Sequence, residues 1–415
     1  MNIDKDTTNT TINKFINKVN LKTFSEIVNV TNLDRYIKKL TCHKFLKLMI
    51  YAQLTEKESL TALADELNDS DELKDFAELK SISKSTLSRH LSKYSPNVFD
   101  QISQCLVREI QKSWNKQGLN DSRKLSIIDS STISMCLSQY PWAEYRQTKA
   151  GVKIHLRVNF MKEMTTPDKL VLLPAVHADR TQMESLVEMD PNTINLFDRA
   201  YNDYKLYDEY SDKEIPFITR LKDNAVYEII STQRVASDLV TKRDLEVFLG
   251  TEYNRMKHSL RLIETTDSVG KRVLILTNCF HMSALEAGDL YRKRWKIETF
   301  FKWMKQHLKL KSLYGKSQNA VYNQILIAFI TYCLLVLLQI KLNYNGNLLR
   351  IKRCMLNLCF QPITHFVQIL FKPSTRTSKG RRKYNYEFEY GIIMNQYMNG
   401  EVEHLNSLAF DPLID

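Results

Sequence analysis

Residues 291–310 read YRKRWKIETFFKWMKQHLKL, a stretch without Gly or Pro that is rich in residues of high helix propensity. We predict one amphipathic helix here, because apolar side chains recur at helical spacing on one side, at Ile297, Phe300, Phe301, Met304 and Leu308. At about 100° per residue, four polar side chains fall on the opposite side within an arc of about 60°: Tyr291, Arg294, Glu298 and Lys305. We expect this polar stripe to face away from the core.

Two interpretations of the polar stripe are open. A solvated helix face commonly carries charges at i,i+4 spacing, and such a face needs no function. The spacing Tyr-x2-Arg-x3-Glu-x6-Lys, with an aromatic residue directly after the Arg, resembles the YREK signature of bacterial DDE transposases of the insertion-sequence-four family. That resemblance also requires two partner aspartates on strands that precede the helix.

The composition of the 415-residue chain is that of a globular protein with a basic surplus. Hydrophobic residues make up 43% and charged residues 26%, and the length predicts two to four domains. The formal net charge of +12 indicates a polyanionic partner, either nucleic acid or an anionic membrane surface.

Further features of the sequence predict a reduced, cytoplasmic location and no membrane span. The N-terminus lacks the apolar region of a signal peptide, and the seven cysteines include no C-x-x-C pair. The apolar segment 325–340 has 16 residues, fewer than the roughly 20 that a spanning helix needs. We therefore expect this segment to form a buried core helix.

Residues 1–120 show helical periodicity almost throughout. Within them, 81–91 reads SISKSTLSRHL, in which a Ser cap precedes a helix that would expose Lys84 and Arg89. This segment resembles the second helix of a helix-turn-helix unit, which predicts that Lys84 and Arg89 bind DNA. A plain bundle helix with a basic face is the alternative.

From about residue 122 the pattern changes to strands. Five are predicted, with helices near 182–186 and 201–210, and the strands cover 124–132, 151–160, 170–176, 192–199 and 216–221. This order of elements is that of the ribonuclease-H-like fold. Asp129 and Asp198 end the first and fourth strands, where the family's first two carboxylates belong.

We therefore predict an α/β protein with a ribonuclease-H-like catalytic core that a β-rich insertion interrupts. A helical N-terminal DNA-binding domain would precede the core, and a C-terminal helical or irregular region would follow it. The predicted bounds are 1–120 for the N-terminal domain, 121–224 and 285–345 for the two parts of the core, 225–284 for the insertion and 346–415 for the C-terminal region. The last region contains a basic run, 372–383, which is either a solvated loop or a DNA contact.

The resemblance implies a site in which Asp129, Asp198 and Glu298 are catalytic and hold two divalent ions, Mg²⁺ or Mn²⁺. Two such ions about 3.5–4 Å apart activate the nucleophile and stabilise the leaving oxygen in phosphodiester chemistry. Carboxylates suffice as ligands, because Mg²⁺ prefers hard oxygen donors.

The remaining signature residues are predicted to bind DNA. Arg294 and Lys305 can hold phosphates of the cleaved strand, and Tyr291 lies beside them on the helix. Trp295 can stack on a splayed base, although a core position is an equal alternative.

The resemblance thus implies a DNA transposase that excises and inserts its own element. Its partners would be double-stranded DNA, as terminal inverted repeats and as target, and it would act as a homodimer on paired ends. A ribonuclease-H-like nuclease without strand transfer and a domesticated, non-cleaving DNA-binding protein are the alternatives. The sequence contains no nucleotide-binding Gly-rich loop, zinc-protease motif or serine-hydrolase motif that would favour other chemistry.

Overall fold

The computed structural model describes residues 10–19, 21–116, 124–161, 164–233, 241–266, 270–308, 310 and 312–372. The chain forms two compact units, Met1–Leu370 and Phe371–Asp415, and the fold below is that of the first. Apart from Lys372, the predicted basic run 372–383 lies outside the described residues.

The N-terminal part of the chain is helical, as predicted. Its helices are α1 (Thr11–Ile16), α2 (Leu21–Val30), α3 (Cys42–Leu54), α4 (Leu60–Asp69), α5 (Asp71–Ala77), α6 (Lys84–Lys93) and α7 (Pro96–Lys116). Several of these helices have a side-chain cap at the N-terminus. In α6, for example, the Ser83 hydroxyl accepts a hydrogen bond from the Thr86 N–H at 3.3 Å.

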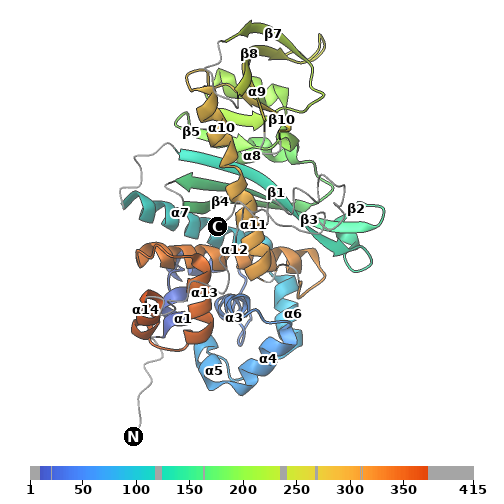
Figure 1. Ribbon diagram of the computed structural model, residues 1–415. Helices are drawn as coiled ribbons and strands as arrows, with labels where there is room; N and C mark the ends of the chain where they lie inside the picture. The colour runs from blue at the N-terminus through green and yellow to red at the C-terminus, as the bar shows by residue number, and fades with distance from the viewer. Residues whose placement is uncertain are drawn as a thin grey trace, which may run out of the picture. The chain divides into compact units, whose positions relative to one another are not determined.

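A single sheet of ten strands follows (Figure 1). Its strands are β1 (Lys124–Cys136), β2 (Glu144–Arg146), β3 (Lys149–Met161), β4 (Met164–Pro174), β5 (Thr193–Phe197), β6 (Phe217–Arg220), β7 (Tyr227–Thr232), β8 (Thr241–Leu249), β9 (Leu260–Thr266) and β10 (Arg272–Thr277). The five strands predicted between residues 124 and 221 are confirmed as β1, β3, β4, β5 and β6.

The topology of these five strands is mixed. β3 lies antiparallel between β4 and β1, whereas β5 runs parallel to β1 and β6 runs parallel to β5. The spatial order is therefore β4-β3-β1-β5-β6. The strands predicted within 225–284 do not form a separate sheet, because β10 pairs with β6 and continues the same sheet through β9 and β8 to β7.

Side chains from alternate positions of the strands enter two different cores. Ile127, Leu196 and Ile218 belong to the larger core, which also contains residues of the helices that follow the sheet. Their neighbours Ile128 and Phe197 belong to the smaller core on the other face, with residues of α8 (Met183–Leu186) and α9 (Tyr204–Asp212). Both faces of the central strands are thus covered, which explains their continuous apolar runs.

The later helices are α10 (Ala284–Arg292), α11 (Trp295–His307), α12 (Gln318–Lys341), α13 (Leu348–Leu358) and α14 (Ile363–Phe371), with short 3₁₀ turns η3 (Pro141–Ala143), η4 (Asp179–Gln182) and η5 (Arg199–Tyr201). α10 and α11 cross the sheet, and α12 runs among the N-terminal helices (Figure 1).

The apolar helix α12 is the centre of the helical bundle. By length and composition it could span a membrane, but 94% of its most apolar 18-residue window is buried inside the protein. It packs against α3, α6 and α7. The Asn323 amide donates to the carbonyls of Leu91 and Tyr94, both at 2.8 Å, which ties α12 to the end of α6. The prediction of a buried core helix is confirmed.

Candidate active site

The register between β1 and β5 brings the two predicted aspartates to the same level of the sheet. Ile128 lies beside Phe197 in this parallel pair, so the next residues, Asp129 and Asp198, continue side by side. Asp129 comes two residues after Ile127, and Asp198 comes two residues after Leu196; both Ile127 and Leu196 belong to the larger core. Side chains two positions apart in a strand share a face, so both aspartates point to the face that α11 covers.

Arg294 and Glu298 complete the group from the helix side. The Arg294 guanidinium donates from Nη1 to Asp129 Oδ2 at 2.8 Å and from Nη2 to Glu298 Oε1 at 2.9 Å. One cation therefore joins two of the three predicted catalytic carboxylates. No hydrogen bond or ion pair connects the Asp198 carboxylate to another of the described residues.

The single helix predicted over 291–310 is wrong, because the chain forms two helices with a break at Lys293 and Arg294. The N–H groups of these two residues donate three positions back, to Leu290 and Tyr291, at 3.0 Å. Such a turn advances about 120° per residue instead of 100°, so α10 and α11 are rotated relative to one continuous helix.

The polar stripe also differs from prediction in its exposure. Arg294 is only 8% exposed and lies between the helix and the sheet, whereas the stripe was expected to face away from the core. The reason is electrostatic: a guanidinium with several donors can pair at once with Asp129 on β1 and Glu298 on α11. Asp129 itself does not end its strand as predicted, because β1 continues to Cys136.

Burial and neighbouring charge act strongly on Asp129. Burial raises the pKa of its carboxyl to about 6; Arg294 and the Ser130 N–H oppose the shift, and the carboxylates of Asp198 and Glu298 add to it. Burial likewise raises the pKa of the Tyr291 phenol to about 12. The site thus carries a surplus of negative charge that Arg294 only partly compensates.

Lys305 contacts the sheet, whereas Trp295 is exposed at the surface. The Lys305 ammonium donates to the Ser131 hydroxyl at 2.7 Å and to the Thr132 carbonyl at 3.0 Å, which fastens α11 to β1. Trp295 is 57% exposed, so its ring is not a core residue, and the Arg294 guanidinium lies 5.5 Å from it. An exposed ring beside the carboxylates is compatible with the predicted stacking role.

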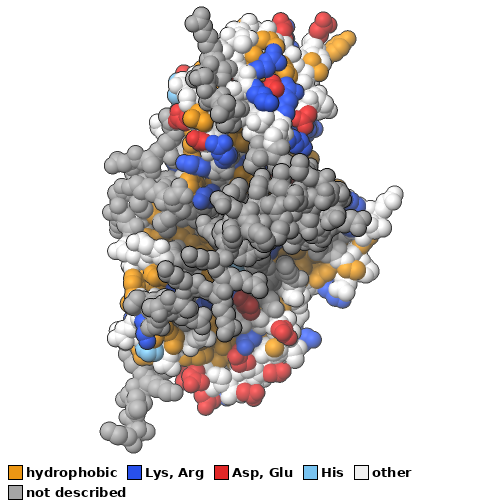
Figure 2. All heavy atoms as spheres, viewed as in Figure 1, with side chains coloured by type: hydrophobic (Ala, Val, Ile, Leu, Met, Phe, Trp, Pro, Cys, Tyr) orange, Lys and Arg blue, Asp and Glu red, His pale blue; other side chains and the backbone are white. Residues whose placement is uncertain are grey.

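Lys84 and Arg89 lie far along the chain from the carboxylates, on the exposed face of α6. α12 holds this helix in place, because the Asn319 amide donates to the Ser92 carbonyl at 3.2 Å beside the Asn323 contacts described above. Asp and Glu side chains gather over the neighbouring helices α4 and α5 (Figure 2). The surface of α4 and α5 is thus acidic, in contrast to the exposed basic residues of α6.

A second polar layer lies under Asp129, on the other face of β1. The Ser130 hydroxyl donates to Asp179 Oδ1 at 2.7 Å, and His155 Nδ1 lies 3.3 Å from the Tyr201 hydroxyl and 3.6 Å from Asp179. His155 is fully buried, which lowers the pKa of its imidazole to about 4 despite Asp179.

We did not predict this layer from the sequence. A usable signal was the polar set at alternate positions of the strand 151–160, at Lys153, His155, Arg157 and Asn159, because one strand face that is wholly polar suggests a covered polar cluster.

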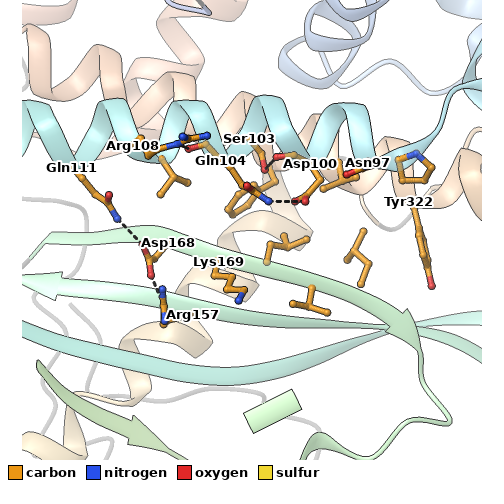
Figure 3. Close-up of a pocket in the computed structure, with 17 residues that line it drawn as sticks. Asn97, Asp100, Ser103, Gln104, Arg108, Gln111, Arg157, Asp168, Lys169 and Tyr322 are labelled. Atoms are coloured by element: carbon orange, nitrogen blue, oxygen red, sulfur yellow. Dashed lines mark hydrogen bonds and ion pairs between the residues drawn. The ribbon is translucent and has the colours of Figure 1, made fainter. Parts of the chain in front are cut away.

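A separate cleft of about 650 Å³ lies between α7 and the β3–β4 pair (Figure 3). Its lining includes Gln111, Arg157 and Asp168 but none of the predicted catalytic carboxylates. The Gln111 amide donates to Asp168 at 2.6 Å, and Asp168 pairs with Arg157. This cleft is therefore a junction between α7 and the sheet.

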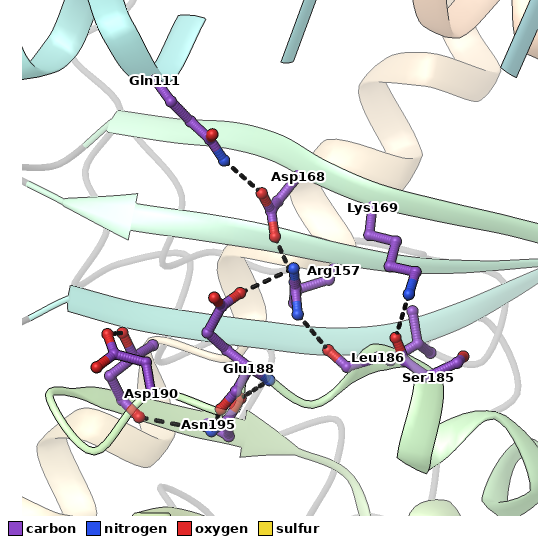
Figure 4. A network of polar contacts seen from close by, with 10 residues as sticks. Gln111, Arg157, Asp168, Lys169, Ser185, Leu186, Glu188, Asp190 and Asn195 are labelled. Atoms are coloured by element: carbon purple, nitrogen blue, oxygen red, sulfur yellow. Dashed lines mark hydrogen bonds and ion pairs between the residues drawn. The ribbon is translucent and has the colours of Figure 1, made fainter. Parts of the chain in front are cut away.

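The junction extends toward the strand that carries Asp198 (Figure 4). Arg157 pairs with Glu188 at 2.8 Å, and the Asn195 side chain bonds the backbone of Glu188 through both its carbonyl and its amide, at 2.9 and 3.0 Å. Asn195 lies on β5, three residues before Asp198. The network thus fixes the position of β5 relative to β3 and α7.

The residue types of the site suit a divalent cation, whereas their arrangement is that of an ion-pair cluster. Carboxylate oxygens are the ligands that Mg²⁺ prefers, and the surplus negative charge around Asp129 would be relieved by a dication. However, no three His, Cys, Asp or Glu side chains of the described part of the chain are grouped so that they could hold a metal ion.

Comparisons with known proteins show the family of the chain. Residues 120–334 match the family described as Transposase DDE domain, and residues 7–74 match a domain of unknown function (DUF4372). The first match covers more than half of the chain and includes Asp129, Asp198 and Glu298. The chain belongs to the transposase DDE domain family, which confirms the resemblance noted in the sequence.

Two curated relatives are transposases by name. The chain is 30% identical over 253 residues to "Probable transposase for insertion sequence element IS5377" of Geobacillus stearothermophilus, with 60% of this chain and 66% of the relative covered. It is 25% identical over 263 residues to "Putative transposase for insertion sequence element IS4SA" of Synechocystis, with 62% and 72% covered. The chain thus spans just under two thirds of the first relative's length.

Among solved structures, the cryo-EM structure of a piggyBac transposase synaptic complex with hairpin DNA is similar at a TM-score of 0.39 and 12% identity, with 88% of this chain and 80% of that chain covered. A likeness at this level supports no conclusion about fold or function.

Proposed function

We propose that the protein is a DNA transposase whose centre for cleavage and strand transfer is formed by Asp129, Asp198 and Glu298. One observation carries the proposal: Asp129 and Asp198 lie level at the neighbouring parallel strands β1 and β5, and Arg294 joins Asp129 to Glu298 of α11. Membership of the transposase DDE domain family supports it.

We further propose that the core is ribonuclease-H-like. The support is topological, because three antiparallel strands followed by two parallel ones, in the order β4-β3-β1-β5-β6, agree with the element order that this fold predicts. In this proposal the bounds 1–120, 121–224, 225–284, 285–345 and 346–415 are regions of function. They are not independent folding units, because α12 lies inside the N-terminal bundle.

In the observed arrangement Arg294 joins Asp129 to Glu298, so Asp129, Asp198 and Glu298 would have to draw together to hold the two divalent ions, Mg²⁺ or Mn²⁺. Such ions supply Lewis-acid activation for phosphodiester chemistry when bound. The chain's own residues orient the site. Lys305 fixes α11 on β1, and Arg294 keeps the buried carboxylates paired. Tyr291 and Trp295 would contact the cleaved strand, with Arg294 and Lys305 contributing positive charge to its phosphates.

The partner in this proposal is double-stranded DNA, as terminal inverted repeats and as target. Lys84 and Arg89 on α6 would bind the ends, and a homodimer would hold two ends together. The net charge of +12 supports a nucleic-acid partner. A cytoplasmic location on DNA follows from this activity.

The test is nicking of a labelled duplex that carries the gene's own flanking DNA, by the full chain in Mg²⁺. We expect Asp129→Asn, Asp198→Asn and Glu298→Gln each to retain binding and to lose nicking by orders of magnitude, because each amide keeps its shape but removes an anionic ligand. Combining two of these changes should add little further loss. Glu246→Gln and Asp203→Asn are the matched controls and should nick normally.

The same assay separates the alternatives. Joining of cut ends to a target plasmid identifies a transposase, whereas cutting without joining identifies a nuclease, and binding without cutting identifies a domesticated DNA-binding protein. Normal nicking by any one of the three carboxylate variants would remove that residue from the proposed centre.

A further inference from the structure

A second cleft, of about 960 Å³, opens beside the smaller core, and its lining is basic. Four segments form it: η4, the start of α9, the connection from β6 to β7 and the connection from β8 to β9. We call it the basic groove, and its positively charged residues are Arg180, Lys205, Lys222, Arg255 and Lys257.

The two acids in the groove make no ion pair with these cations. Asp203 caps α9 by accepting the N–H groups of Lys205 and Leu206, at 3.1 and 3.4 Å. Asp208 accepts the N–H groups of Lys257 and His258, at 3.0 and 2.9 Å. Both carboxylates are therefore engaged with backbone.

Most of the basic side chains have no partner within the described residues. Arg255 pairs with Glu228 at 2.6 Å. The charged ends of Arg180, Lys205, Lys222 and Lys257 are exposed and make no hydrogen bond or ion pair to the described part of the chain. The groove thus presents five basic against two acidic side chains on a concave surface, and all five basic ones are exposed.

The groove and the proposed catalytic centre share one edge of the sheet, on its two faces. β5 and β6 are parallel, so Asp198 after β5 and Lys222 after β6 leave the sheet at the same edge. Arg180 follows Asp179, whose carboxylate accepts the Ser130 hydroxyl next to Asp129. DNA that leaves the carboxylates across this edge would therefore meet the groove.

We propose that the basic groove binds the phosphates of the DNA duplex that continues from the cleavage point. This inference rests on the proposed function for the position of the DNA. Such binding does not depend on the sequence of the DNA. Exposed ammonium and guanidinium groups that neutralise phosphates release the counterions condensed on the DNA, and this release drives association. The groove is a contact separate from α6.

The test measures binding without chemistry. Full-length protein is titrated in EDTA onto a fluorescein-labelled 30-bp duplex of arbitrary sequence, at salt concentrations between about 50 and 200 mM. The groove variant is Lys205→Gln, Lys222→Gln and Lys257→Gln together. The control variant is Lys213→Gln, Lys242→Gln and Arg243→Gln, which removes the same charge from exposed positions outside the groove.

We expect the dissociation constant of the groove variant to rise about tenfold or more and its salt slope to become shallower by about 2 to 3, because each lost phosphate contact contributes about 0.9. The control variant should bind like wild type. Equal thermal midpoints for the two variants show that both are folded.

If the groove and control variants bind the duplex alike, the groove proposal is wrong, while the nicking test of the carboxylates still decides the catalytic proposal. If the groove variant loses affinity only for phosphatidylserine vesicles and keeps its affinity for the duplex, the groove is a membrane contact and the proposal is also overturned.

Discussion

Arg294, which precedes α11, and Asp129 on β1 are joined by a hydrogen bond of 2.8 Å although 165 residues separate them in the chain. The same guanidinium pairs with Glu298, so one positive charge is shared by two carboxylates in a largely buried place. Any cation that enters the site must therefore compete with Arg294 for the same oxygens.

This competition predicts the effect of Arg294→Gln on metal affinity. Removing the guanidinium should tighten Mn²⁺ binding by about tenfold, because the positive charge that repels the ion and occupies the carboxylates is lost. Titration followed by electron paramagnetic resonance of free Mn²⁺ measures this without any DNA. Arg292→Gln is the control, because Arg292 is exposed and pairs with Asp289 on its own helix. Weaker Mn²⁺ binding by Arg294→Gln would mean that the guanidinium organises the ligands instead of competing with the ion.

The basic face of α6 predicts a loss of end binding in the variant Lys84→Ala with Arg89→Ala. We expect the full chain with both changes to bind its flanking DNA more weakly, with a salt slope shallower by about 1 to 2. Gel-shift titrations at several salt concentrations measure both effects. The variant Lys74→Ala with Lys80→Ala on the acidic side of the bundle is the control. Unchanged affinity in the α6 variant would support the plain bundle helix.

The ion pairs of Arg157 with Asp168 and Glu188 predict that Arg157→Met strongly lowers the free energy of unfolding. Asp168 has a side chain only 6% exposed, and without Arg157 its charge would be left buried with Gln111 as its remaining partner. We expect a loss of about 3–5 kcal/mol in the free energy of unfolding, measured in urea. Arg108→Met is the same change at an exposed position of the same cleft and should cost less than about 0.5 kcal/mol. A small effect for Arg157→Met would show that water enters and compensates Asp168.

The buried imidazole of His155 predicts an acid-sensitive contribution to stability. Its pKa is lowered from 6.5 to about 4 in the folded protein, so the unfolded chain takes up a proton first as the pH falls. The contribution of His155 to the free energy of unfolding is fully present above about pH 6.5 and is lost as the pH falls from 6.5 to about 4. Between pH 7.5 and 5.0 the loss is about 2 kcal/mol.

The comparison of wild type with His155→Asn isolates this contribution. Asp179, Lys153 and His177 face the imidazole and are the same in both proteins. Urea unfolding at pH 7.5 and 5.0 should show about 2 kcal/mol less pH dependence in the variant. Identical pH dependence would mean that His155 is charged in the folded protein.

Local periodicity was sufficient to predict most of the fold. Alternation and β-branched runs predicted the strands around Asp129 and Asp198, and the same alternation puts both carboxylates on one face of the sheet. The apolar surface of α12 predicted its burial, since a helix that is hydrophobic all round has no solvated side.

Three features depend on contacts between distant segments, which no local pattern contains. The break between α10 and α11 at Lys293 has no signal in the local sequence, which contains residues of high helix propensity on both sides. Only the hydrogen bonds of the structure reveal it. The burial of Arg294 depends on carboxylates 165 and 4 residues away. The pairing of Ser130 with Asp179 likewise joins positions 49 residues apart.

The place of α12 within the N-terminal bundle has a consequence for synthesis on the ribosome. α3, α6 and α7 leave the exit tunnel early, but the helix on which they pack is encoded some 200 residues later, at Gln318–Lys341. Domains generally fold as units during synthesis, N-terminal first, and this bundle is an exception because its core is incomplete until α12 has been made. A nascent chain released before residue 341 would lack the bundle core that positions α6. Premature termination should therefore yield products that are cleared by proteolysis and do not compete with the intact protein for DNA.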